Sequence, residues 1–191
     1  MKKYKFTGET KTIYLPFGTV TLHRIKAVVE FGLVKVGDLG GWIEKEENLS
    51  HEENAWVYGD AEVCGNAKVY GNAKVCGNAK VYGDAEVYGN AWVCGNAEVR
   101  GNAWVCGNAK VFSTDHVLVI GAIGSRNDFT TFFRDKDNEI TVKCGCFLGK
   151  IDKFLEKVTQ THKDTKHTLA YRTAVEVAKL QIDLTEKSTR R

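Results

Sequence analysis

The residues best suited to bind a small molecule gather in one polar segment, residues 121–134. Two glycines there expose backbone N–H groups, hydroxyl side chains add donors, and two arginines offer planar forks that match phosphate oxygens. A phenylalanine adds a ring on which a base can stack, and a lysine on the next expected strand extends the positive charge. We therefore expect a phosphate-bearing ligand to be held by Ser125, Arg126, Asp128, Thr130, Thr131, Phe133, Arg134 and Lys143. An ordinary turn with polar surface residues is the alternative interpretation of this segment.

Cysteine and histidine side chains are the other candidates for chemistry. Cys144 and Cys146, together with His162 and His167, have the composition of a zinc site, but the second cysteine pair of a zinc ribbon is missing. A cysteine nucleophile with a histidine base is a further alternative, although nothing in the sequence shows their proximity or an activated thiol. We expect no cofactor, and metal binding by Cys144 and Cys146 stays open.

The middle of the chain, which must support these residues, consists of an internal repeat. Residues 55–112 contain ten uninterrupted hexapeptide repeats, the tenth of which stops at Phe112. Valine returns every six residues, alanine precedes it by two, and Gly-Asn or Gly-Asp follows in the first nine. A short strand and a corner per hexapeptide, with glycine and asparagine accepting positive φ, gives a three-sided coil lined by valine and alanine. The sequence therefore predicts a left-handed parallel β-helix.

The same period sorts the outward side chains into three faces, because residues 18 apart stack on successive coils. One face is too rich in aromatic rings and thiols to be left in water. We expect this face to pack on another subunit, a homotrimer being favoured, or on the terminal segments of the chain, through Trp56, Tyr58, Trp92 and Phe112. Cys76 and Cys94 stack within disulfide reach on this face, but we expect them to remain free thiols.

Residues 1–54 are expected to form a β cap, since an open β-helix end exposes strand edges and core. Apolar stretches near residues 4–6 and 19–25 predict a hairpin across Pro16–Gly18, and residues 28–36 predict another strand. The glycine-rich segment 37–44 then leads into a degenerate first coil, with Trp42 plugging the open core. A phosphate-binding loop is the less favoured alternative for this segment, because no helix and no Lys-Ser/Thr pair follow.

Residues 113–191 predict a small α+β domain of three strands followed by two helices. Strand patterns cover residues 116–120, 129–134 and 139–146. Apolar residues at helical spacing follow in two runs, which begin at Ile151 and Tyr171. The fold class is therefore mainly β, with a β-helix between an N-terminal β cap and a C-terminal βββαα domain whose exchange between subunits stays open.

Charge and composition limit the partners. The net charge is +3, and the excess lies in residues 113–191, which hold 14 basic and 11 acidic residues. This excess is too small for a duplex nucleic-acid surface, but it allows a local phosphate pocket. No apolar run is long enough for a membrane span or a signal peptide, so we expect a cytoplasmic protein with reduced cysteines.

Several short motifs carry a resemblance to known proteins. Residues 6–10 (FTGET), 22–25 (LHRI), 37–44 (GDLGGWIE) and 48–50 (NLS), followed by the hexapeptides, resemble little-characterised phage and prophage proteins with hexapeptide repeats. The likeness covers roughly residues 4–112. It implies a β-helix scaffold in a viral or prophage setting and implies no activity.

Three functions are weighed on this basis. A hexapeptide-repeat acyltransferase shares the fold, but those enzymes project a loop with a catalytic histidine from the repeats, and residues 55–112 contain neither. We expect a phage-encoded, oligomeric binding protein without enzymatic activity. In its favoured form it captures a phosphate-bearing molecule such as a cyclic nucleotide defence signal of the host. A structural virion protein or an inhibitor of a host protein is the further alternative.

Overall fold

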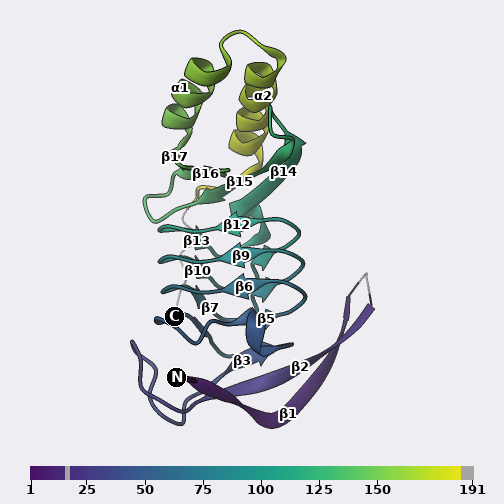
Figure 1. The fold of residues 1–191 in the computed structure, drawn as a ribbon, viewed down its shortest axis with the longest axis vertical. Helices are drawn as coiled ribbons and strands as arrows, with labels where there is room; N and C mark the ends of the chain where they lie inside the picture. Colours follow the sequence, from purple (N-terminus) through teal and green to yellow (C-terminus); the bar gives the residue numbers. More distant parts are fainter. Residues whose placement is uncertain (16–17, 186–191) are drawn as a thin grey trace.

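The fold has three parts stacked along one axis. The computed structural model describes residues 1–15 and 18–185. An N-terminal β layer lies at one end, a column of short coils in the middle, and a sheet covered by two helices at the other end (Figure 1). The expected mainly β class, with a parallel β-solenoid of hexapeptides and a small C-terminal α+β part, is confirmed.

The solenoid consists of two-residue strands that pair in parallel with the coil above and below. Trp56 lies opposite Lys74 and Lys74 opposite Trp92, so the predicted stacking of residues 18 apart is confirmed. The strands lie in three sheets, in the orders β13-β10-β7-β4, β12-β9-β6 and β5-β8-β11, the last of which continues into the N-terminal strands. Their bounds are β4 Trp56–Val57, β5 Glu62–Val63, β6 Lys68–Val69, β7 Lys74–Val75, β8 Lys80–Val81, β9 Glu86–Val87, β10 Trp92–Val93, β11 Glu98–Val99, β12 Trp104–Val105 and β13 Lys110–Val111.

The interior of the solenoid is a continuous column of small apolar side chains. Each repeat valine from Val57 to Val111 and each repeat alanine from Ala55 to Ala109 is buried, as the alternation of facing directions along a strand requires. Because alternate residues face outward, the charged and aromatic members of the hexapeptides lie on the outer faces, where the N-terminal cap covers Trp56. The expectation that valine lines the axis is therefore confirmed.

The corners hold the coils at contact distance. The glycine of each corner has positive φ, and a Cβ added at Gly83 would lie 2.9 Å from the backbone nitrogen of Gly101 on the next coil. Side-chain amides add ladders beside these glycines, as where Asn54 Nδ2 donates to Asn72 Oδ1 at 2.9 Å. Glycine is thus required both for its φ and for the close approach of the coils.

The N-terminal cap continues one face of the solenoid. The hairpin of β1 (Tyr4–Leu15) and β2 (Gly18–Ala27) is confirmed, and Pro16 and Phe17 of its expected turn lie outside the described residues. Strand β3 (Leu39–Ile43) pairs with β2 on one side and in parallel with β5 on the other. A short 3₁₀ turn, η1 (Glu46–Asn48), then leads into the first full coil.

Two expectations for the cap are wrong. Residues 28–36 form turns with one isolated bridge, Phe31 to Val34, rather than a strand. Trp42 does not plug the core: it pairs with the outward Glu62, and its ring lies between the cationic groups of Lys11 and Arg24. Tyr4, Ile43 and Trp56 belong instead to the buried cluster that is continuous with the solenoid core.

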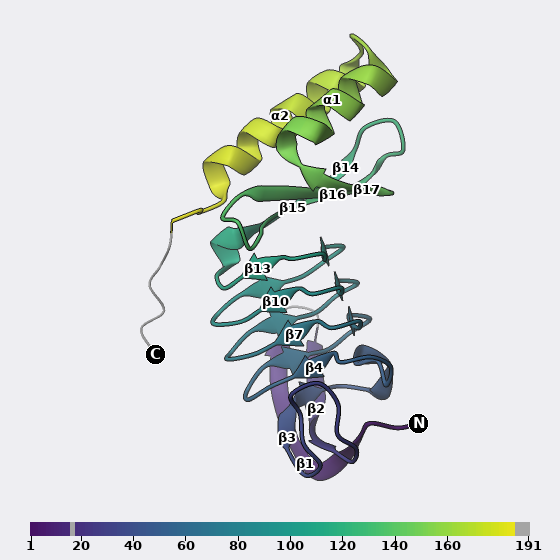
Figure 2. The ribbon, with the colours of Figure 1, turned by 90° about the vertical axis from the view of Figure 1, so that its left-hand side faces the viewer.

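The C-terminal part forms a lid over the last coil. After the 3₁₀ turn η2 (Thr114–His116), four antiparallel strands follow in the order β14 (Val117–Ile123), β15 (Asp128–Arg134), β16 (Ile140–Cys144) and β17 (Phe147–Lys150). The expected three strands are therefore corrected to four. Helices α1 (Ile151–His162) and α2 (Lys166–Gln181) cover the face of this sheet that points away from the solenoid (Figure 2).

Neighbouring residues of β15 contact the solenoid on one side and the helices on the other. Phe133 belongs to the buried core of the solenoid, whereas Phe132 belongs to the core between the sheet and the helices. Alternate strand residues point to opposite faces, so β15 joins the two cores through consecutive side chains. The chain is further tied to the last coil where Lys136 N donates to Asn108 O at 3.0 Å.

Two further observations concern covalent and membrane features. Cys76 and Cys94 form a disulfide between stacked coils, with Cα atoms 4.5 Å apart, so the expectation that both stay free thiols is wrong. Within residues 1–15 and 18–185, no helix combines the length and apolarity needed to cross a membrane.

Two corner glycines provide a test of coil packing. Gly83 and Gly101 both have positive φ, but a Cβ on Gly101 meets no atom within 4 Å. Gly101→Ala should cost about 1–2 kcal/mol of unfolding free energy, the ordinary cost of a left-handed alanine. Gly83→Ala should cost clearly more, because its methyl group also meets the next coil. Urea unfolding followed by circular dichroism measures both, and equal losses would contradict the close-approach argument.

Candidate functional site

A hollow of about 230 Å³ opens on the helix side of the C-terminal sheet. The β14–β15 loop, the β16–β17 turn and both helices form its walls. Phe147, Phe154 and Val158 supply an apolar wall, and the remaining lining residues are polar, namely Ser125, Arg126, Asp128, Cys144, Gly145, Cys146, Lys157, Thr161, His162 and Tyr171. The hollow therefore joins apolar surface to a set of ionisable and nucleophilic groups.

Two cationic side chains border this hollow from different elements. Arg126 comes from the β14–β15 loop and Lys157 from the exposed side of α1. A Cβ added at Gly145 would lie 3.0 Å from Arg126 Nη1, so the guanidinium group rests against the β16–β17 turn. Two cations beside an apolar wall are suited to an anionic ligand with an apolar portion.

A chain of polar contacts forms the floor of the hollow. Thr130 Oγ1 donates to Cys144 Sγ at 3.3 Å, and the Cys144 thiol donates to the Tyr171 hydroxyl oxygen at 3.8 Å. Burial, with the Cys144 hydrogen bond and nearby charge, raises the pKa of Tyr171 to about 12, so the phenol keeps its proton at neutral pH. The His162 ring stacks on Tyr171 with centroids 6.0 Å apart.

The position of the Tyr171 hydroxyl group requires glycine at position 124. A Cβ there would lie 1.9 Å from the Tyr171 hydroxyl oxygen. The β14–β15 loop therefore depends on Gly124 to bring Ser125 and Arg126 next to α2.

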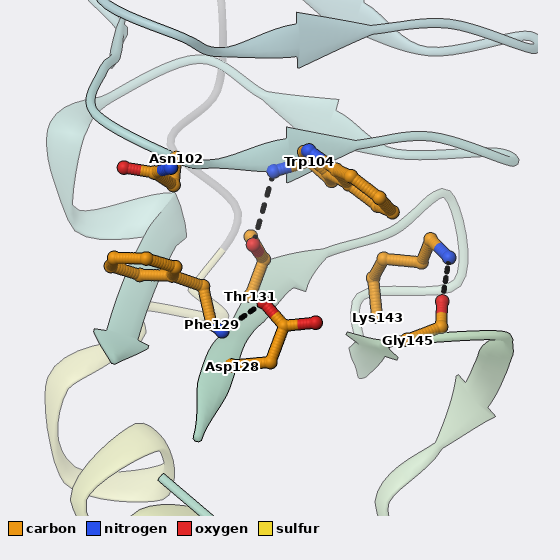
Figure 3. Close-up of a pocket in the computed structure, with 7 residues that line it drawn as sticks. All are labelled: Asn102, Trp104, Asp128, Phe129, Thr131, Lys143 and Gly145. Carbon is orange, nitrogen blue, oxygen red and sulfur yellow. Dashed lines mark hydrogen bonds between the residues drawn. The ribbon is translucent and has the colours of Figure 1, made fainter. Parts of the chain in front are cut away.

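A second, smaller hollow of about 60 Å³ lies between this sheet and the solenoid. Figure 3 shows Trp104 and Lys143 on one side of it and Asn102 and Phe129 on the other. The Lys143 ammonium group lies 4.8 Å from the centre of the Trp104 ring and donates to the carbonyl oxygen of Gly145. Asp128 and Gly145 line both hollows, which are therefore adjacent.

The structure divides the residues expected from the sequence. Ser125, Arg126 and Asp128 line the helix-side hollow, and Thr131 and Lys143 line the solenoid-side hollow. The others lie inside the protein. Phe133 is in the solenoid core, Thr130 is buried beside Cys144, and Arg134 is buried where its Nε donates to Asn138 Oδ1 at 2.9 Å.

The residues that α1 and α2 bring to the hollow were not predicted as part of the phosphate site. Lys157, His162 and Tyr171 lie 23 or more residues beyond the β14–β15 segment that they face. His162 and Cys144 were noted only as metal or nucleophile candidates. Within the described residues, no group of three or more His, Cys, Asp or Glu side chains is arranged to hold a metal ion.

The expected oligomer face is partly covered by the chain itself. Trp56 is 1% exposed and packs edge-on against Tyr4 and Phe31 of the cap. Tyr58 and Phe112 are half-buried, whereas Trp92 is 39% exposed between Lys74 and Lys110. The alternative that this face packs on the chain's own terminal segment therefore accounts for Trp56, and trimer formation stays a prediction.

These observations define the protein as a hexapeptide-repeat β-solenoid with a ligand-sized hollow in an appended α+β part. No protein-family model matches the chain. The chain is 36% identical over 77 residues to YdcK of Escherichia coli strain K12, which is named an uncharacterized acetyltransferase. The match covers 35% of this chain and 24% of that relative, so the chain spans about a quarter of the relative's length. This similarity overturns the expectation that the protein is not an enzyme.

The cysteines provide a test of the site's exposure. Burial raises the pKa of the Cys64 thiol to about 11 and also raises that of Cys106, whereas Cys146 is exposed beside the hollow. Only the thiolate reacts quickly, so at pH 8 a chromogenic disulfide reagent should label Cys146 well before either buried thiol. Cys146→Ser should remove the fast phase of labelling, and Cys106→Ser should leave that phase unchanged. The reverse result would contradict the exposed position of Cys146 beside the hollow.

Proposed function

We propose that the protein is an acyltransferase that binds a phosphate-bearing acyl donor in the helix-side hollow. The observation that carries this proposal is the hollow itself, in which Arg126 and Lys157 border a wall of Phe147, Phe154 and Val158. Carriers of acyl groups such as coenzyme A combine phosphates with a flexible arm, in which methyl and methylene groups alternate with amides, and a reactive thiol end. The cations match the phosphates, and the apolar wall matches the arm and the acyl chain.

The solenoid repeats offer no histidine for acid–base catalysis, which supports placing the reaction in the helix-side hollow. Residues 55–112 contain no histidine, and their hexapeptides follow one another without an inserted loop. General acid–base chemistry needs a side chain that exchanges protons near neutral pH, and histidine is the commonest choice. The candidate for that role is His162, which lines the hollow together with the cations. Similarity to a protein named an acetyltransferase supports the reaction class.

The proposed step uses one imidazole as base and then as acid. The acceptor's amine or hydroxyl group attacks the carbonyl carbon of the thioester and gives its proton to His162. The C–S bond then breaks, and the leaving thiolate takes that proton from the imidazolium ion. Tyr171, which keeps its proton, offers an O–H donor beside the histidine.

A cyclic nucleotide is a second candidate ligand for the same cations. Arg126 and Lys157 match its phosphates, and the aromatic rings of the adjacent hollow offer stacking surfaces for its bases. The resemblance of residues 4–112 to phage proteins supports a nucleotide signal of host defence as the source. Mass spectrometry of small molecules released from the denatured protein separates this ligand from an acyl carrier.

The two cations provide the first test of this function. Arg126→Ala and Lys157→Ala should each weaken binding of coenzyme A about tenfold or more, since each removes a charge-assisted contact to phosphate. Titration calorimetry measures the affinity. Lys153→Ala is the matched control, because this exposed lysine of α1 pairs with Glu156 and does not line the hollow. Unchanged affinity in both hollow variants would refute the site.

His162 provides the second test. His162→Gln should lower thiol release from acetyl-coenzyme A by about a hundredfold or more, measured with a panel of amine and alcohol acceptors, while affinity for the donor stays unchanged. His167→Gln is the control, because the His167 ring contacts His162 with centroids 5.7 Å apart but does not line the hollow. Wild-type turnover by His162→Gln would exclude it as the base.

A further inference from the structure

We propose that the solenoid-side hollow binds the nucleobase of a nucleotide whose phosphate lies at Arg126 in the helix-side hollow. This inference rests on the proposed function, because it concerns another part of the same ligand. It narrows the ligand class from a phosphate-bearing molecule to a nucleotide, either free or as part of an acyl carrier.

Two aromatic rings on different parts of the chain face this hollow. Trp104 lies on β12 of the solenoid and is 38% exposed, and Phe129 lies on β15 and is 39% exposed. Rings of this size are usually buried, and their partial exposure on both sides of one hollow leaves flat apolar surface for a ligand. Stacking on such rings binds any base, because every base has a π face.

Polar groups at the rim match the edge of a base. Asn102 provides an amide with donors and an acceptor, and Asp128 provides a carboxylate whose Oδ1 already accepts from Phe129 N at 2.7 Å. Its second oxygen is a further acceptor, suited to an exocyclic amino group. Figure 3 shows Asn102 and Asp128 on opposite sides of the Phe129 ring.

A cation lies on each side of the β16–β17 turn, and both contact Gly145. Lys143, which is 8% exposed, donates to the Gly145 carbonyl oxygen from the solenoid side. Arg126 lies against the α-carbon of Gly145 from the helix side. A nucleotide that crosses this turn therefore meets an aromatic platform at one end and a guanidinium group at the other, with a second cation between them.

The two strands that carry these rings are joined to each other before any ligand binds. Trp104 N donates to Thr131 Oγ1 at 3.0 Å, which ties the last coil to the strand that carries Phe129. The Lys143 ammonium group over the Trp104 ring adds a cation–π contact. A preorganised platform of this kind loses little conformational entropy on binding.

Trp92 is a matched control within the same solenoid. Its ring is 39% exposed and also lies beside lysine ammonium groups, at 4.9 Å from Lys74 Nζ and 3.3 Å from Lys110 Nζ. Trp92 lines neither hollow. A general effect of exposed tryptophan would appear in both residues, whereas a base site involves Trp104 alone.

The experiment compares matched probes with and without a base. Titration calorimetry should show that adenosine monophosphate binds about tenfold or more tightly than ribose 5-phosphate. Trp104→Leu should remove this difference while leaving the ribose 5-phosphate affinity unchanged, Trp104→Phe should keep most of it, and Trp92→Leu should keep all of it. Quenching of tryptophan fluorescence by the nucleotide should likewise be reduced in Trp104→Phe and kept in Trp92→Leu. Coenzyme A and a cyclic dinucleotide, run in parallel, identify the source of the nucleotide.

The outcomes separate the two proposals. Equal affinity of wild type for the two probes, or full adenosine monophosphate affinity in Trp104→Leu, overturns the base site. The proposed function survives that result as long as ribose 5-phosphate binding depends on Arg126. Absence of binding by every phosphate probe overturns both proposals.

Discussion

The structure depends on the hydrogen bonds that join each coil to the next, 18 residues further along the chain. These bonds form only when corners turn at the same place on each coil. The corner glycines adopt the positive φ of the turn, and the inward alanines and valines of the repeats are small enough to pack inside every coil. Because every repeat meets both conditions, the valine column is dry and the outer faces are free to vary. The solenoid thus acts as a rigid support whose ends need covers.

The two covers differ in what they add. The N-terminal hairpin extends one solenoid sheet and buries Trp56, so its role is to close the core. The C-terminal sheet closes the other end with Phe133 and uses its opposite face, through Phe132, to carry the helices. A hollow arises on each face of this sheet near its β16–β17 turn, so the lid that completes the scaffold also creates the candidate site.

Features that a local sequence pattern encodes were predictable, whereas contacts between segments far apart in the sequence were not. The hexapeptide period predicted the coil register, because strand, corner and core position all lie within six residues. The strand patterns of residues 116–146 predicted that Arg126, Asp128 and Lys143 lie near one another, since they are on neighbouring strands and a connecting loop. The fourth strand, the burial of Phe133 and the arrival of Lys157 and His162 depend on how the lid packs, which no local pattern encodes. The Cys76–Cys94 disulfide was not predicted, because a cytoplasmic protein is expected to keep its cysteines reduced even where the 18-residue period stacks them.

The three-sided coil also couples chain length to the orientation of its two ends. Removing one hexapeptide would leave every remaining corner intact but would rotate the C-terminal sheet and helices by about 120° around the solenoid axis relative to the hairpin. Removing three would restore the original orientation and bring the ends closer by about 4.8 Å. Insertions and deletions in such a chain therefore change the direction in which the ligand hollow faces in discrete steps, without altering the hollow itself.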